Sequence, residues 1–445
     1  KPSLTAINKN LNRKDAFLKD FGYIFMFNMP KSKIHHLNLL LYFLLSITFF
    51  IGYFLGEDSS GSGGFIGDFY GTWPVLQLIK NGEYFNFLEY TIHFPLHYYI
   101  LFFLNLVVDS QDTVRFVFTL ISLTVPYIFF LILQERYSNI EINKLFFFSQ
   151  VLFLMPSLRS GAIWANTQLS ALIFFMISIL FFLKWDNRNL NKIDKHVVLQ
   201  CFFLSLAVYS RQLYAIIFIF ILYLYFLKLS FKEFIKVSLI IFIFALPGFF
   251  IAFSLPKTLT LSFYLNLANS LIVNTSIISF YLIPIFFIIG LSKFKELKTT
   301  DINKTYYIVF LSSLFLVIFS HLYFNYNPSL GGGFFIKLSM IIFSNLYFFF
   351  FTAIIGIVLI MLIFKEDKKS IILFILLVFG FSSHQIFQKY YEPMMLILLF
   401  SIINFNQIKI ILNNYKNIFL FHSYFLIYLI LAIINDIFKI TKTFV

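Results

Sequence analysis

The sequence predicts an all-α protein that crosses the membrane repeatedly, with about 11–14 transmembrane helices and a long first outer loop containing short helices. Hydrophobic residues make up 60% of the chain, charged residues only 12%, and the mean hydropathy is +0.86. A soluble core has no room for so much apolar surface. Apolar runs close to the roughly 20 residues of a bilayer crossing also recur along the chain, separated by short polar segments.

Residues 1–36 are polar and basic, and we expect them to form a cytoplasmic N-terminal segment. The segment is too long and too mixed to be the n-region of a cleaved signal peptide. Met29 offers an alternative start, which makes residues 1–28 an extension of the native chain.

The chain continues as a series of apolar runs, each predicted to form one span. In chain order they are approximately 37–55, 94–108, 114–133, 163–183, 197–209, 213–227, 237–254, 275–290, 305–323, 338–363, 370–381, 394–412 and 418–435. Several are shorter than a full crossing, so we expect some of these helices to tilt or to enter the bilayer only partway.

Lysine-containing connections orient the bundle, because cytoplasmic loops carry an excess of Lys and Arg. The basic connections are 1–36, 184–196, 228–236, 291–304 and 364–369. All are cytoplasmic only if one early apolar segment, 145–155, does not cross; it is short and ends at Pro156. The opposite face then receives the loops 56–93, 134–162, 210–212, 255–274, 324–337 and 382–393. Nearly all the unusual polar groups of the chain lie in these loops.

Charge and cysteine content exclude several classes of function. The net charge of +14 arises from lysines beside the spans, and no soluble module carries the interleaved Arg and aromatic residues of a nucleic-acid interface. The single cysteine, Cys201, lies in an apolar run and excludes a disulfide framework or a cysteine-ligated metal cluster.

Asp68 is the strongest candidate for chemistry. It lies in Gly64-Phe65-Ile66-Gly67-Asp68-Phe69-Tyr70, where glycines and aromatic residues surround one carboxylate. A loop that folds back to the membrane surface would hold this acid in a partly apolar pocket, where it suits a general base. The competing interpretation is a solvated or helix-capping aspartate.

Four other ionisable residues of the first loop are candidate substrate contacts. Glu57 and Asp58 follow the first span directly, where interfacial acids are common. His93 and His97 are spaced to share a helix face at the mouth of the second span, as substrate contacts or as plain interface packing. No HExxH pattern or third ligand accompanies them, so a metal site is not predicted.

An arginine between two apolar segments raises the free energy of membrane insertion unless its charge meets an anionic partner or water. Arg211, followed by Gln212, is such a residue, and its guanidinium fork suits a phosphate. Arg159 is a weaker case of the same kind. The competing interpretation is an arginine at a helix end that reaches the lipid head groups.

Two late loops add polar groups on the predicted outer face. One carries His384, Lys389 and Glu392 with two tyrosines; the other is a glycine-rich turn, 331–333, followed by Lys337. The turn is not a Walker motif, because GK[ST] is missing. Both segments are predicted to close around a lipid phosphate and a sugar.

These features together resemble the GT-C fold of membrane glycosyltransferases, and within it the dolichyl-phosphate-glucose alpha-1,2-glucosyltransferases. That family carries an acidic residue in the first lumenal loop, a Leu-Pro-x-x-Tyr element at the second span and a later Arg-Gln pair. Asp68, Phe94-Pro95-Leu96-His97-Tyr98 and Arg211-Gln212 stand in comparable places. The chain departs from the pattern in two ways. No acid lies beside Asp68, and Leu213-Tyr214 stand where Thr-Asn would follow the Arg-Gln pair.

The resemblance implies a GT-C-like module over residues 37–230, including the outer loop 56–93, and a more variable helical module over 231–445. It also implies sugar transfer from an undecaprenyl- or dolichyl-phosphate donor to a lipid-linked glycan or other acceptor, with inversion and with Asp68 as base. The donor phosphate is assigned to Arg211, with His384 and Lys389 as helpers at the same phosphate and Gln212 as a substrate contact. The acceptor side is assigned to Glu57, Asp58 and His97, with His93, Arg159, Lys337 and Glu392 as further substrate contacts.

Two alternatives remain open. An O-antigen polymerase or ligase also handles polyprenyl-linked glycans, but usually has its large arginine-containing outer loop late in the chain. A lipid-linked oligosaccharide flippase or transporter should line a central path with charges and often shows internal repeats.

No cofactor is expected, because a polyprenyl-phosphate sugar carries its own leaving group; a requirement for a divalent cation stays open. The expected partners are the donor, the acceptor and membrane lipids, with no nucleic acid. The expected location is a bacterial inner membrane, or the ER membrane in a eukaryote, with the active site on the outer or lumenal face.

Overall fold

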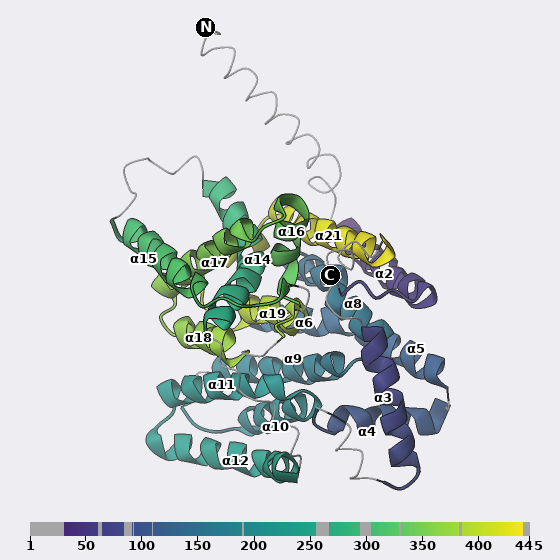
Figure 1. Ribbon diagram of the computed structural model, residues 1–445. Helices are drawn as coiled ribbons and strands as arrows, with labels where there is room; N and C mark the ends of the chain where they lie inside the picture. Colours follow the sequence, from purple (N-terminus) through teal and green to yellow (C-terminus); the bar gives the residue numbers. More distant parts are fainter. Residues whose placement is uncertain are drawn as a thin grey trace.

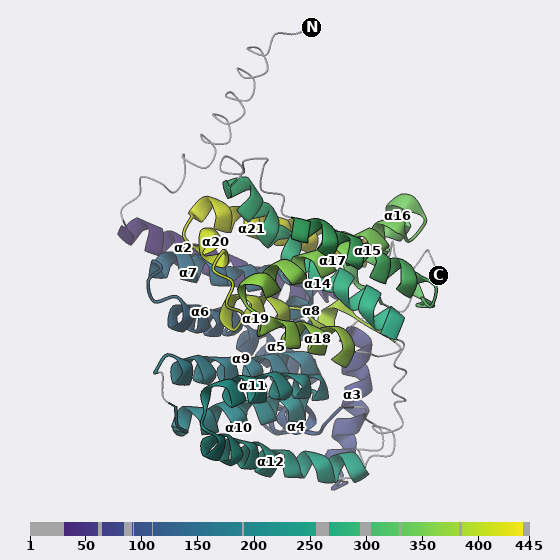
Figure 2. The ribbon, with the colours of Figure 1, turned by 90° about the vertical axis from the view of Figure 1, so that its left-hand side faces the viewer.

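The computed structural model describes residues 31–60, 65–83, 91, 93–108, 110–188, 191–254, 267–293, 304–328, 331–381 and 385–438. All regular structure within these ranges is helical (Figures 1 and 2). The predicted all-α class is therefore confirmed.

The first part of the chain builds one side of the molecule. Its helices are α2 (Lys31–Leu55), α3 (Phe65–Lys80), α4 (Leu96–Val108), α5 (Gln111–Ser122) and α6 (Val125–Arg136). The loop after the first span thus contains a helix of four turns, α3, as predicted for a first loop with short helices. In both ribbon views α3 runs steeply along the edge of the stacked α9, α10, α11 and α12.

The segment predicted not to cross is broken. It forms α7 (Ile142–Ser149) and η2 (Gln150–Leu154), and the chain then bends by 67° into α8 (Pro156–Ile163). Pro156 starts α8 because proline has no backbone N–H to donate to the preceding turn and is tolerated at a helix start. This geometry is that of a broken span or a re-entrant loop.

Four stacked helices follow, ending near residue 254 (Figure 1). They are α9 (Thr167–Asp186), α10 (Lys195–Ser210), α11 (Ala215–Lys228) and α12 (Phe231–Ser254), with η3 (Gln212–Tyr214) between α10 and α11. The apolar part of α12 is only 11% buried within the protein. Such an apolar and uncovered helix requires lipid around it.

The last part of the chain packs around a central helix, α14 (Leu267–Lys293), whose apolar part is 83% buried. Around it lie α15 (Lys304–His321), α16 (Gly333–Phe343), α17 (Tyr347–Glu366), α18 (Ser370–Gly380), η5 (Gln388–Tyr390), α19 (Met394–Ser401), α20 (Ile408–Leu412) and α21 (Tyr415–Phe438). Gly356 lets α17 approach α14 closely, because a Cβ at Gly356 would overlap the carbonyl oxygen of Thr275.

Among the described residues, seven helices are long and apolar enough to cross a membrane, or eight if the bent pair counts as one span. Six further apolar helices in the described part of the chain are shorter, at 10–17 residues. The polytopic membrane class is therefore supported, whereas the expected 11–14 crossings would need the short helices to cross as well.

Two predicted spans are each divided into two helices that do not continue as one candidate span. The run 338–363 is divided between α16 and α17, because Ser344 takes a left-handed conformation (φ 54°) that ends α16. The run 394–412 is divided into α19 and α20, with a turn between them. Both interruptions fall at short polar residues, Ser344-Asn345 and Asn404, within otherwise apolar sequence.

Candidate functional site

Asp58 fixes the start of the helix that carries Asp68. Its carboxylate accepts hydrogen bonds from the backbone N–H groups of Phe65 (3.0 Å) and Ile66 (3.4 Å) at the first turn of α3. A negative charge at a helix N-terminus is favourable. Burial raises the pKa of Asp58, and the two backbone hydrogen bonds oppose this rise.

Asp68 lies one turn into α3 with its side chain half exposed. Lys389 Nζ lies 3.2 Å from Asp68 Oδ2, and Asn166 Nδ2 donates to the same oxygen at 3.1 Å. Asp68 Oδ1 accepts no hydrogen bond from any described residue. One carboxylate oxygen is thus held in place, while the other accepts no hydrogen bond from the described residues and can take a proton from a substrate hydroxyl.

Lys389 comes from η5, far along the chain, and its side chain is only 7% exposed. Its ammonium lies over the rings of Phe65 (4.6 Å) and Phe387 (5.2 Å). Burial lowers the pKa of Lys389, while the nearby charge of Asp68 raises it. The charge of Arg211 also acts on Lys389, so two cations share this part of the protein.

Arg211 connects α10 to η3 and is 5% exposed. Its guanidinium lies 4.9 Å from the centre of the Tyr390 ring and donates to Thr167 Oγ1 at 3.2 Å. The Nε–H of Arg211 is buried and has no hydrogen-bond partner among the residues that the structure describes. A buried donor without a partner costs free energy. Arg211 therefore keeps binding capacity for an anion or a water molecule.

The two histidines do not share a helix face. His93 precedes α4 and its Nδ1 lies 3.3 Å from Gln212 Oε1, whereas His97 lies within α4 and its Nδ1 lies 2.9 Å from Ser170 Oγ. The spacing prediction was wrong because α4 begins only at Leu96. Desolvation and then the charge of Arg211 lower the pKa of His93 to about 3, so it is a neutral hydrogen-bonding group.

Glu57 and Arg159 form a buried ion pair with each other. Arg159 donates to both Glu57 carboxylate oxygens, at 2.8 and 2.6 Å, and to Thr48 Oγ1 and O at 2.7 and 3.0 Å. The two side chains are 4% and 9% exposed. This pair ties the segment before Asp58 to α2 and α8, and its polar atoms are occupied within the protein.

Glu392 is also occupied within the protein. Its carboxylate accepts from the Ser157 backbone N–H at 2.9 Å and from the Tyr428 hydroxyl at 3.0 Å, and its carbonyl accepts from Gln168 Nε2 at 3.0 Å. Burial raises the pKa of Glu392 to about 7. Glu392 thereby joins α8, α9 and α21.

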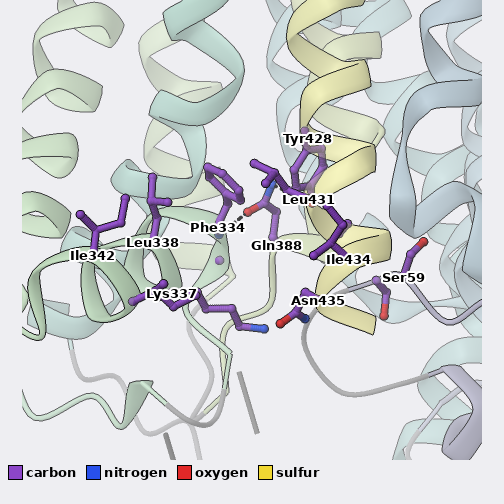
Figure 3. A pocket seen from close by; sticks show the side chains of 14 residues that line it. Ser59, Phe334, Lys337, Leu338, Ile342, Gln388, Tyr428, Leu431, Ile434 and Asn435 are labelled. Carbon is purple, nitrogen blue, oxygen red and sulfur yellow. Dashed lines mark hydrogen bonds between the residues drawn. The ribbon is translucent and has the colours of Figure 1, made fainter. Parts of the chain in front are cut away.

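The remaining candidates lie elsewhere. Lys337 lines a cavity between α16 and α21 (Figure 3). His384 falls outside the described residues. No group of three or more His, Cys, Asp or Glu in the described ranges could hold a metal ion.

No family model, curated protein or solved structure matches this chain.

Two residues of the site carry no clear signal in the sequence. Asn166 holds Asp68 and also caps α9, since its Oδ1 accepts from the Gln168 backbone N–H at 3.0 Å. Tyr390 stacks on Arg211. A polar run after Trp164 and a tyrosine beside a lysine are too common to predict either role.

Proposed function

We propose that the protein is a GT-C type glycosyltransferase, which transfers a sugar from a polyprenyl-phosphate donor to an acceptor hydroxyl on the outer or lumenal face of a membrane. One observation carries this proposal. The Asp68 side chain is half exposed, one of its carboxylate oxygens is held by Lys389 and Asn166, and the charge of Arg211 acts on the same Lys389. An accessible base beside two buried cations suits a reaction that takes up a proton and releases an anion.

Asp68 acts as the general base. The acceptor oxygen attacks the anomeric carbon of the sugar, and its proton passes to Asp68 Oδ1 as the new bond forms. The bond from the anomeric carbon to the phosphate oxygen breaks on the opposite face, so the configuration inverts. The electron pair leaves with the polyprenyl phosphate, and water later takes the proton from Asp68.

Arg211 and Lys389 act on the donor phosphate. Negative charge develops on the phosphate oxygen as the sugar leaves, and preorganised cations stabilise such charge most where water is excluded. Arg211 has an unused N–H for this purpose and is oriented by Tyr390 and Thr167. Neutral His93, held by Gln212, is available to a sugar hydroxyl.

The proposal is tested with purified protein in detergent and a labelled polyprenyl-phosphate sugar. Asp68→Asn should lower the turnover number by about 10²–10⁴-fold, the usual contribution of a positioned base. Asp112→Asn serves as the matched control, because the Asp112 side chain is 77% exposed and pairs only with Arg115 at the start of α5. Cleavage of nucleotide sugars, without transfer from any polyprenyl-phosphate donor, would refute the proposal.

The proposed sidedness is tested by cysteine labelling in sealed vesicles. Gln77→Cys on α3 and Arg188→Cys after α9 introduce thiols at exposed positions, while the native Cys201 is buried. The two positions should label from opposite sides of the membrane. Labelling from the same side would overturn the proposed topology.

A further inference from the structure

A cavity of about 320 Å³ lies between α16 and α21 (Figure 3). Its volume falls in the range of about 300–1,000 Å³ that is usual for ligand pockets. Most of its lining is apolar, from Phe334, Leu338, Ile341, Ile342, Leu431 and Ile434. The cavity is thus suited to a hydrocarbon chain.

Two polar groups on the cavity wall lack partners. Lys337 makes no ion pair or hydrogen bond with any residue that the structure describes. The Ser60 hydroxyl is buried, its residue being 5% exposed, and has no hydrogen-bond partner in the described part of the chain. In Figure 3 the side chains of Lys337 and Asn435 point toward one another across the cavity. An anionic group with free acceptor oxygens would satisfy both Lys337 and Ser60.

A chain of hydrogen bonds stands between this cavity and Glu392. Gln388 lines the cavity, accepts from the Phe334 backbone N–H at 2.6 Å and donates to the Tyr428 hydroxyl at 3.2 Å. Tyr428 in turn donates to Glu392. The next residue, Lys389, is directed instead to Asp68. Of these two consecutive residues of η5, Gln388 therefore lines the cavity and Lys389 contacts Asp68.

We propose that this cavity binds one acyl chain of an anionic membrane phospholipid, with its phosphodiester on Lys337 and Ser60. The single positive charge of Lys337 matches the single negative charge of a phosphodiester. The apolar walls contributed by α16 and α21 match the chain. The bound lipid joins α16 to α21 beside Gln388 and is a structural ligand, so the proposal does not depend on the transferase activity.

The test is native mass spectrometry of the full-length protein in neutral detergent, titrated with phosphatidylglycerol. The wild type should retain one phosphatidylglycerol molecule more tightly than phosphatidylcholine, whose head group is neutral overall. Lys337→Gln should weaken phosphatidylglycerol binding by about 10- to 100-fold, the loss expected for a charge-assisted hydrogen bond. Ala432→Phe should fill the cavity and weaken both lipids.

Lys416→Gln is the matched control, because Lys416 is an exposed lysine at the other end of α21. It should bind phosphatidylglycerol as the wild type does. Equal binding by Lys337→Gln and wild type, or no retention by the wild type, would overturn the proposal. So would displacement of phosphatidylglycerol by a lower concentration of polyprenyl phosphate, which would mark the cavity as a substrate site. This experiment measures lipid binding and not sugar transfer. A protein that binds phosphatidylglycerol but transfers no sugar would therefore refute the proposed function and leave the lipid site standing.

Discussion

Replacing Arg159 with methionine is expected to lower the free energy of unfolding by about 3–5 kcal/mol, because it leaves the Glu57 carboxylate buried without its partner. The structure supports the upper part of this range. Arg159 donates four hydrogen bonds of 3.0 Å or less to Glu57 and Thr48, and both charged side chains are below 10% exposed. Gly52→Ala should act in the same direction, since its Cβ would overlap the Glu57 carboxylate.

The assay is unfolding in mixed micelles with increasing SDS, followed by tryptophan fluorescence. Trp164 is a suitable reporter because its Nε1–H donates to the Glu57 carbonyl at 2.9 Å. The double variant Glu57→Leu/Arg159→Met should recover most of the lost stability, because two apolar side chains replace the whole pair. The exposed pair Lys236–Glu233 provides the control, and Lys236→Met should change little. This reasoning would be refuted if Arg159→Met lowers the free energy of unfolding by less than about 1 kcal/mol. It would also be refuted if the loss in the double variant equals the sum of the losses in the two single variants.

Three further predictions concern the site and its support. Arg211→Lys should raise the donor KM at least about tenfold, because an ammonium loses both the guanidinium fork and its stacking on Tyr390; steady-state kinetics with varied donor checks this, and an unchanged KM contradicts it. Lys389→Met should lower kcat about tenfold or more, because Asp68 loses its charged partner; an unchanged kcat at saturating donor would contradict it. Wild-type stability should fall by about 3 kcal/mol as the pH rises from 4.5 to 7, because the folded state raises the pKa of Glu392 to about 7 and so holds a proton that the unfolded chain releases. SDS unfolding at several pH values should show a flatter profile for Glu392→Gln, and an equally steep profile would exclude this cause.

Local sequence signals predicted the helical class and several features of the fold. The apolar runs predicted the helices, and Pro156 predicted the break after the segment 145–155. Asp68 and Lys389 were both singled out as unusual polar residues, and the structure brings them into contact. The predictions of the helices and of the break succeeded because each depends on residues that are close together in the sequence, whereas the roles of Asp68 and Lys389 stay predictions.

Contacts between side chains that are far apart in the sequence could not be predicted in the same way. Glu57 and Arg159 were assigned separate substrate contacts, yet they bind each other across 102 residues. Asn166 reaches Asp68 across 98 residues. Only the packing of α2, α3, α8 and α9 brings these side chains together, and one sequence without its relatives carries no record of that packing.

The separation of Asp68 from Lys389, 321 residues, has a consequence for the newly made protein. At about 5–20 residues per second, the ribosome adds Lys389 roughly 15–65 seconds after Asp68. Throughout that interval α3 is present without the cation that holds its aspartate. A nascent chain, or one cut short before residue 389, is therefore expected to lack at least the tenfold in kcat that Lys389→Met removes, so that the proposed transfer reaches its full rate only when synthesis is nearly complete.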